Sequence, residues 1–104
     1  MLLADNDISV ELDVAWVVRG GQDPIAWIGA NGQRITAAHV KDIAPKGENA
    51  DEDGWADVGH GTMPWADIMT ALRDTPCTTF VMEHDNPKDH NRFASRSLAT
   101  VQAL

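Results

Sequence analysis

The sequence predicts an α/β fold in which short parallel strands alternate with helices. Apolar segments at 8–13, 34–40 and 78–83 are typical of buried strands, and each precedes a segment with helical spacing. Alternation of this kind is typical of parallel sheets joined by right-handed crossovers. Each predicted strand also ends in a side chain that can bind a metal. Because parallel strands end at one edge of their sheet, we expect these side chains to lie close together.

The first strand-helix unit is predicted from alternation and from a helix-start signal. Apolar and polar residues alternate over 8–13, as on a strand with one buried face. The apolar run 15–18 is interpreted as leading into a flexible glycine loop. Asp23 and Pro24 predict the start of a short helix that ends between residues 29 and 32. Residues 1–4 are interpreted as the end of another helix.

The second unit combines a strand with a long loop. Ile35, Ala37 and His39 share one face of the predicted strand 34–40. Residues 41–61 are rich in glycine and are predicted to be a loop throughout. Within this loop, the acidic run 48–53 is interpreted as a solvated edge. A loop of this length in a compact domain is usually functional or disordered.

The third unit places a helix before the last strand and another after it. Apolar residues at helical spacing predict a helix that opens at 62–65 and ends near Asp74. A last helix is expected from about Asn91, after the strand 78–83. The side chains that it is expected to bury are Phe93, Leu98, Val101 and Leu104. The aromatic and sulfur-containing side chains interpreted as core are Trp27, Trp65, Met69 and Phe93.

Composition excludes several classes of protein. With 104 residues, 43% of them hydrophobic, the chain fits one domain, 1–104, of modest stability. The net charge of −8 makes nucleic acid and anionic membrane surfaces poor partners. The single Cys77 cannot form an internal disulfide, and the first residues lack the features of a secretion signal. We therefore expect a cytoplasmic protein without a membrane span.

The strand-end residues Asp13, His39 and Glu83 form a candidate metal-ligand set. Two carboxylates and an imidazole with open positions suit Mn²⁺, Co²⁺, Fe²⁺, Zn²⁺ or Mg²⁺. Spacing alone makes this a weak signal. A strand-end aspartate often caps a helix or loop, and a strand-end histidine often only packs against its neighbours.

Four linked segments of the chain match motifs of a known family in the right order. They are Glu11–Asp13 with Trp16–Pro24, His39–Asp42, Val58–Gly61 with Pro64–Trp65, and Phe80–Glu83 with Asp85. Together they resemble the late part of the sugar phosphate isomerase/epimerase family, the xylose isomerase-like TIM barrels. The resemblance covers nearly the whole chain. It implies a partial TIM barrel of about three C-terminal strand-helix units.

The resemblance implies a metal site of which one ligand is missing. In the family, a glutamate, an aspartate, a histidine and a second glutamate from four consecutive strands hold the metal, with Mn²⁺ favoured. Asp13, His39 and Glu83 match the last three of these ligands, and the first glutamate has no counterpart. Because relatives are barrels of about 250 residues with eight units, this chain resembles a fragment. Either it is truncated, or it associates with something that supplies the rest.

The chemistry implied by the resemblance is proton transfer next to the carbonyl of a sugar or sugar phosphate, through a metal-stabilised enediolate. Glu83 would be both ligand and general acid/base, and the second such glutamate is the missing one. Trp16 stands where many relatives carry a histidine; it would either stack on the sugar or pack under the barrel rim. Lys41 and His60 are expected to face the substrate, and Asp85 to orient the Glu83 carboxylate.

Two alternatives remain beside an isomerase or epimerase, and a third is set aside. A keto-inositol dehydratase of the same family would use the same proton abstraction. A non-catalytic remnant, or a self-associating module that binds a metal or partner, would explain a chain that leaves sheet edges uncovered. A DNA-repair endonuclease shares this barrel, but it needs more ligands and a basic surface that this acidic chain lacks.

Overall fold

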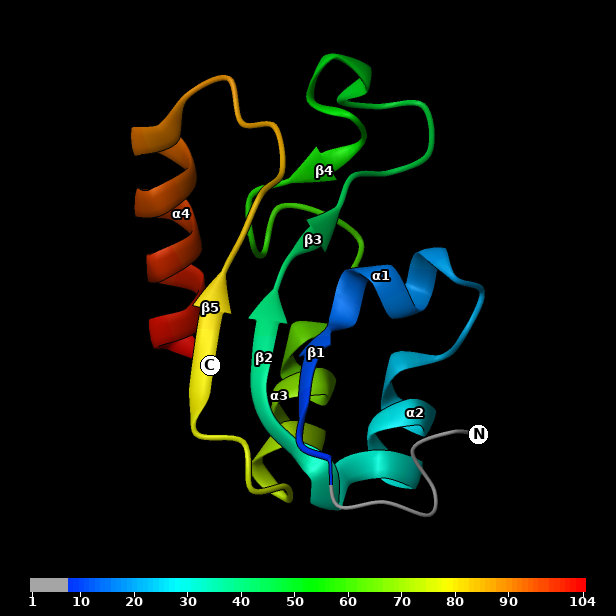
Figure 1. Cartoon of the computed structure of the whole chain (residues 1–104). Coiled ribbons are helices and arrows are strands. Elements are labelled where there is room, and N and C mark those ends of the chain that lie inside the picture. Colours follow the sequence, from blue (N-terminus) through cyan, green and yellow to red (C-terminus); the bar gives the residue numbers. More distant parts are fainter. Residues whose placement is uncertain (1–7) are drawn as a thin grey trace.

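The computed structural model describes residues 8–104 and confirms an α/β fold with a parallel sheet. Its three strands are β1 (Val10–Asp13), β2 (Ile35–Val40) and β5 (Thr79–Met82), in the order β1-β2-β5. Both pairings are parallel, as the strand-helix alternation predicts (Figure 1). The helix end expected at residues 1–4 lies outside the described residues. Within residues 8–104, no helix is long and apolar enough to cross a bilayer.

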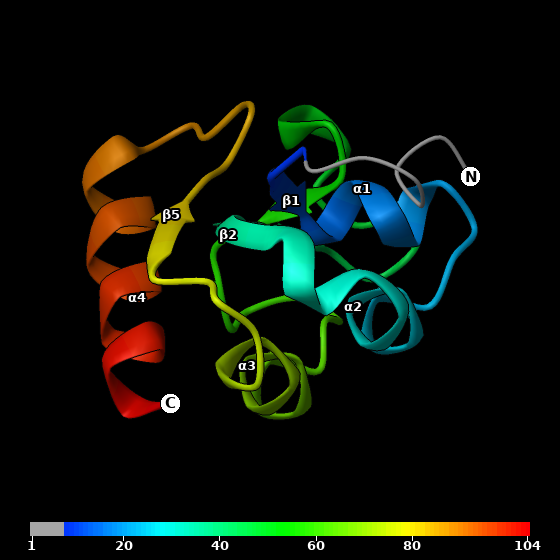
Figure 2. The same cartoon turned by 60° about the horizontal axis from the view of Figure 1, so that its bottom comes forward.

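Within the described residues 8–104, helices cover only one face of this sheet. The helices are α1 (Val14–Arg19), α2 (Pro24–Asn31), α3 (Trp65–Arg73) and α4 (His90–Ala103), with a 3₁₀ turn at Gly32–Arg34. Figure 2 shows α3 under the sheet, with α2 and α4 on either side of it. On β2, Ala38 and Val40 are buried, while Ala37 and His39 on the opposite face are only half-buried. The alternation on the strand therefore separates a core face from an open face.

The core lies between the sheet and α2 and α3. Ile28 from α2, Val40 from β2 and Leu72 from α3 are among its fully buried members. The predicted core role of Trp65 and Met69 is confirmed, and Trp27 packs against the same cluster while remaining half-buried. Burial of these apolar faces is the main favourable contribution to folding.

The start of α2 is built as the sequence predicts. The Asp23 carboxylate accepts hydrogen bonds from the backbone N–H groups of Ile25 (2.9 Å) and Ala26 (3.4 Å). Pro24 occupies the first turn, where its missing N–H costs nothing. The helix ends at Asn31, within the expected range.

The interpretation of residues 15–18 as a run into a loop is wrong, because Val14–Arg19 form α1. Asp13 caps this helix: its Oδ1 accepts a hydrogen bond from the N–H of Trp16 at 3.1 Å. Val14 and Ala15 are buried, so packing stabilises a helix too short to form by itself.

The prediction of an unbroken loop over 41–61 is also wrong. β3 (Asp42–Ile43) pairs antiparallel with β4 (Trp55–Ala56), and Ala50–Glu52 form a 3₁₀ turn. Strands of two residues carry no detectable periodicity, so only tertiary contacts define them. The acidic run is not entirely solvated either. Glu52 is buried and pairs with Arg92 of α4.

Asp42 ties this hairpin to α3. Its buried carboxylate accepts hydrogen bonds from five donors: the N–H groups of Ile43, Gly59, Gly61 and Met63, and the indole N–H of Trp65. A Cβ at Gly61 would stand 2.4 Å from Asp42 Oδ1, so this close approach requires glycine. The single carboxylate therefore determines how the chain enters α3.

In the last helix, α4, the expected burial of Leu98 is wrong, and the neighbouring Ser97 is buried instead. Leu98 is 46% exposed, while Ser97 is fully buried and accepts a hydrogen bond from the N–H of Val58 (3.1 Å). Phe93 packs edge-on against His84, with ring centroids 5.7 Å apart, and Val101 is half-buried. Since α4 lies against the edge strand β5 and against loop backbone, the close contact falls on a small polar residue.

Candidate metal centre

Strand register brings the three predicted ligands together. Asp13 pairs with His39 across β1 and β2, and His39 pairs with Val81 of β5. Glu83 continues this edge, with its N–H donating to the Val40 carbonyl at 2.9 Å. One donor atom from each of Asp13, His39 and Glu83 lies within 4.8 Å of the others. The structure thus confirms that these strand-end side chains gather at the carboxyl edge.

The His39 imidazole lies at the centre of this group. Its Nδ1 contacts Glu83 Oε1 and lies 3.8 Å from Asp13 Oδ2. Its Nε2 lies 2.7 Å from Oε1 of Glu11, a residue of β1 that sequence reasoning did not include in the site. Both ring nitrogens therefore face carboxylates.

The donor set fits a divalent cation. Glu83 Oε1 is buried and makes no hydrogen bond, although it contacts His39 Nδ1. A buried carboxylate oxygen normally has a hydrogen-bond or metal partner. Two carboxylate oxygens and one imidazole nitrogen are ligands that first-row divalent metals accept. Asp13, His39 and Glu83 are thus a candidate metal-binding group.

Lys41 is a buried lysine that forms an ion pair with the candidate ligand Asp13. It is only 2% exposed, and its Nζ donates to Asp13 Oδ2 at 2.9 Å and to Asp85 Oδ2 at 3.0 Å. Burial by itself lowers the pKa of Lys41, but the hydrogen bonds and charges of Asp13 and Asp85 outweigh this and leave the pKa raised. The ammonium group therefore bridges the two carboxylates of Asp13 and Asp85.

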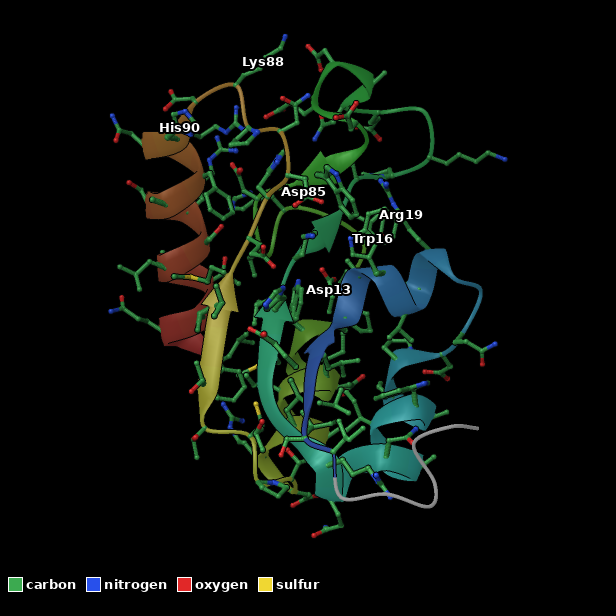
Figure 3. The ribbon with its side chains drawn as sticks, viewed as in Figure 1. Asp13, Trp16, Arg19, Asp85, Lys88 and His90 are labelled. Carbon is green, nitrogen blue, oxygen red and sulfur yellow. The ribbon has the colours of Figure 1, made fainter. Side chains whose placement is uncertain are left out.

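Asp85 contacts a different partner from the one expected. It binds Lys41 and has no hydrogen bond to Glu83 among the interactions of the described residues. Figure 3 shows Asp85 and Asp13 at the same end of the sheet. Asp85 thus acts on Asp13 through Lys41.

An aromatic wall lies next to Asp13. Trp16 is 50% exposed and meets Trp55 edge-on, with ring centroids 5.2 Å apart and planes inclined by 68°. The Arg19 guanidinium lies 3.6 Å from the Trp55 ring centroid, at cation–π distance. Figure 3 shows Arg19 and Trp16 close together beside α1. Sequence reasoning missed Trp55 because it lies in the segment interpreted as loop. It supports Trp16 from below and leaves half of that side chain facing solvent.

Two histidines lie away from the ligand set. His60 is exposed and lines a separate cavity with Arg92 and Arg96. The ring of His84 is buried, and burial lowers its pKa against the opposing effect of Glu52. His84 Nδ1 accepts a hydrogen bond from the N–H of Asn86 at 3.0 Å. Neither ring reaches the donor atoms of the candidate metal centre.

The class that the fold and the site define is an α/β protein with a three-stranded parallel sheet and a candidate metal-binding group of two carboxylates and one histidine at its carboxyl edge. A solved sugar phosphate isomerase/epimerase from Parabacteroides distasonis superimposes with a TM-score of 0.68 and 26% identity. The match covers 91% of this chain and 30% of that one.

A second structure with the same description and organism gives a TM-score of 0.62, 24% identity, and coverage of 91% and 30%. No protein-family model matches the sequence, and no curated protein matches it significantly. The structural match confirms the resemblance to sugar phosphate isomerases/epimerases and a partial fit to a TIM-barrel isomerase. The matched region is only 30% of the length of each of these two proteins.

Proposed function

We propose that this chain carries part of the active site of a divalent-metal-dependent sugar or sugar phosphate isomerase or epimerase. In this proposal residues 1–104 correspond to the C-terminal three of the barrel's eight units. One observation carries it. Asp13, His39 and Glu83 bring their donor atoms within 4.8 Å of one another at the carboxyl edge of a fold shared with a sugar phosphate isomerase/epimerase.

In the proposed site, Asp13, His39 and Glu83 hold a divalent cation. Mn²⁺ is our choice, and Mg²⁺, Co²⁺, Zn²⁺ or Fe²⁺ would suit the same donors. When bound, such a cation supplies Lewis-acid polarisation of a sugar carbonyl. Lys41 keeps the Asp13 carboxylate oriented, and Asp85 in turn anchors Lys41. His60 has no role at this centre.

Glu83 is the proposed general acid/base. In an isomerisation it would take a proton from the carbon next to the sugar carbonyl and deliver it, on the same face, to the former carbonyl carbon, while the hydroxyl hydrogen moves to the other oxygen. Epimerisation needs a second acid/base on the opposite face, and we propose that the remainder of a barrel supplies it. Within residues 8–104, β1 and β5 are the edge strands of the sheet, and their edges and the sheet face that carries no helix are where that segment, or a second copy of the chain, would pack.

Trp16 is the proposed sugar-binding wall. Trp16 lies in the first turn of α1, the helix that Asp13 caps. Half of its side chain is exposed, and the other side packs against the Trp55 ring. Aromatic faces stack on the apolar faces of sugar rings, so this position favours a substrate whose ring lies over the metal site. The chemistry is assigned to the cytoplasm, in line with the single cysteine of the chain.

The test is Mn²⁺ calorimetry on the purified chain, with its oligomeric mass measured on the same sample. Binding that disappears in His39→Ala and Glu83→Ala, and persists in the exposed-loop control Glu48→Ala, supports the proposed centre. Absence of binding in a folded sample refutes it and favours a non-catalytic module. If binding is shown, an N-terminal barrel segment is added and the products formed from a candidate ketose and from a keto-inositol are analysed. An isomerase or epimerase gives a product of unchanged mass, whereas a dehydratase gives a product that has lost water.

A further inference from the structure

We infer that Glu11 is a positioning residue that selects the tautomer of His39 and directs its Nδ1 lone pair at the metal site. The inference rests on the proposed metal centre and adds to it a residue that makes no contact with the metal. It is carried by one contact, the 2.7 Å approach of Glu11 Oε1 to His39 Nε2.

Strand geometry explains how Glu11 reaches this position. Glu11 and Asp13 are two residues apart on β1, so their side chains project from the same face of the sheet. The residue directly across from Glu11 on β2 is Ala37, and the next residue on that face is His39. Since the methyl group of Ala37 is short, the longer Glu11 side chain can extend past it to the imidazole.

The chemistry of the contact determines where the imidazole proton lies. An ionised carboxylate only accepts hydrogen bonds, so the Glu11 contact requires a hydrogen on Nε2. Nδ1 faces Asp13 and Glu83, so in the absence of a cation these carboxylates require a hydrogen on Nδ1 as well. A bound cation would replace that hydrogen and take the Nδ1 lone pair, while Nε2 keeps its hydrogen on Glu11. A carboxylate that binds the outer nitrogen of a metal-ligating histidine orients the ring and makes it a better ligand.

The Glu11 side chain is too exposed for its contact with His39 to contribute much to folding stability. Its side chain is 58% exposed, and that of His39 is 27% exposed. Exposed ion pairs contribute little to folding stability because solvent screens them. Removing the Glu11 carboxylate should therefore leave the fold intact and act on the ligand set alone.

The first measurement compares Mn²⁺ affinity in the full chain and three variants. Glu11→Ala removes the acceptor, and we expect about 10- to 100-fold weaker binding. Glu11→Gln removes the charge but retains a carbonyl acceptor, so its affinity should fall by no more than a few-fold. Glu48→Ala, an exposed acid in the hairpin loop, controls for the change in net charge.

The second measurement uses diamagnetic Zn²⁺, one of the cations that suit these donors, in place of paramagnetic Mn²⁺. Nitrogen-15 NMR of the imidazole rings in the Zn²⁺-saturated chain reports which nitrogen carries the hydrogen and which binds the metal. The His39 signals are identified by their loss in His39→Ala, since the chain has four histidines. We expect the Nε2–H form to dominate in the wild type and in Glu11→Gln. Both tautomers should appear in Glu11→Ala.

The results separate this inference from the proposed function. Wild-type affinity and an unchanged tautomer in Glu11→Ala would overturn the inference while leaving the metal centre in place. Equal weakening by Gln and Ala with an unchanged tautomer would also overturn it, because only charge would then matter. If the wild type binds neither Mn²⁺ nor Zn²⁺, the metal centre fails and this inference, which rests on it, fails with it.

Discussion

Replacing Asp42 by alanine is expected to remove much of the stability of this chain. The carboxylate accepts hydrogen bonds from five donors, and two of them, the N–H of Met63 and the indole N–H of Trp65, are fully buried. A buried donor left without an acceptor costs about 1–3 kcal/mol. The two buried donors therefore cost about 4 kcal/mol together, against a typical total stability of about 5–15 kcal/mol.

Asparagine at the same position gives a graded comparison. Asp42 Oδ2 accepts from the N–H groups of Gly59 and Gly61 and from the Trp65 indole, while Oδ1 accepts from Ile43 and Met63. An amide retains one of these oxygens and turns N–H groups toward the donors of the other. Asp42→Asn should therefore lose about 2 kcal/mol, roughly half of the alanine effect.

Urea unfolding followed by circular dichroism measures both changes. Glu48→Ala is the matched control, since this exposed acid of the same hairpin should shift stability by no more than about 0.5 kcal/mol. If Asp42→Ala unfolded within about 1 kcal/mol of the wild type, the reasoning would be refuted. The hairpin and the start of α3 would then be held by other contacts.

Two further predictions concern titratable groups away from the metal centre. The hydrogen bond from Arg92 lowers the pKa of Glu52, so the stability from this pair is complete above the ordinary glutamate pKa of about 4.3 and is lost as pH falls through the lower folded value. In urea unfolding, the stability difference between wild type and Glu52→Gln should therefore shrink from pH 7 to pH 3, and a constant difference would contradict the pairing. Burial raises the pKa of the Cys77 thiol, so the native chain should react with a thiol reagent at least about 10-fold more slowly than the urea-unfolded chain. Equal rates would show that Cys77 is accessible.

Local patterns in the sequence predicted the elements whose formation depends mainly on neighbouring residues along the chain. The alternation over 8–13 and 34–40, and the Asp23–Pro24 start signal, depend on neighbours along the chain, and all three are confirmed within a few residues. α1 was missed because its stability depends on the burial of Val14 and Ala15 against other elements. The hairpin of β3 and β4 was missed because two-residue strands have no period.

The candidate site shows the same division. That Asp13, His39 and Glu83 gather at one edge followed from parallel strand order, since each stands at a strand's carboxyl end. The side chains that bind those ligands could not be predicted from the order of the strands. Glu11 binding to His39, and Asp85 acting through Lys41, depend on side-chain reach across strands, which sequence spacing does not encode.

The sequence by itself therefore determined the class of fold, the order of the strand-helix units and the identity of the three candidate ligands, because each depends on local periodicity and chain order. Only the tertiary structure decided which charges are buried. Lys41 and Asp42 stand next to each other at the start of the segment predicted to be a loop, yet both are buried, and each has several partners that lie far from it in the sequence. The free-energy cost of removing a charge from water is offset only where several hydrogen-bonding or charged partners surround it. Partners from distant parts of the sequence come together only in the folded chain.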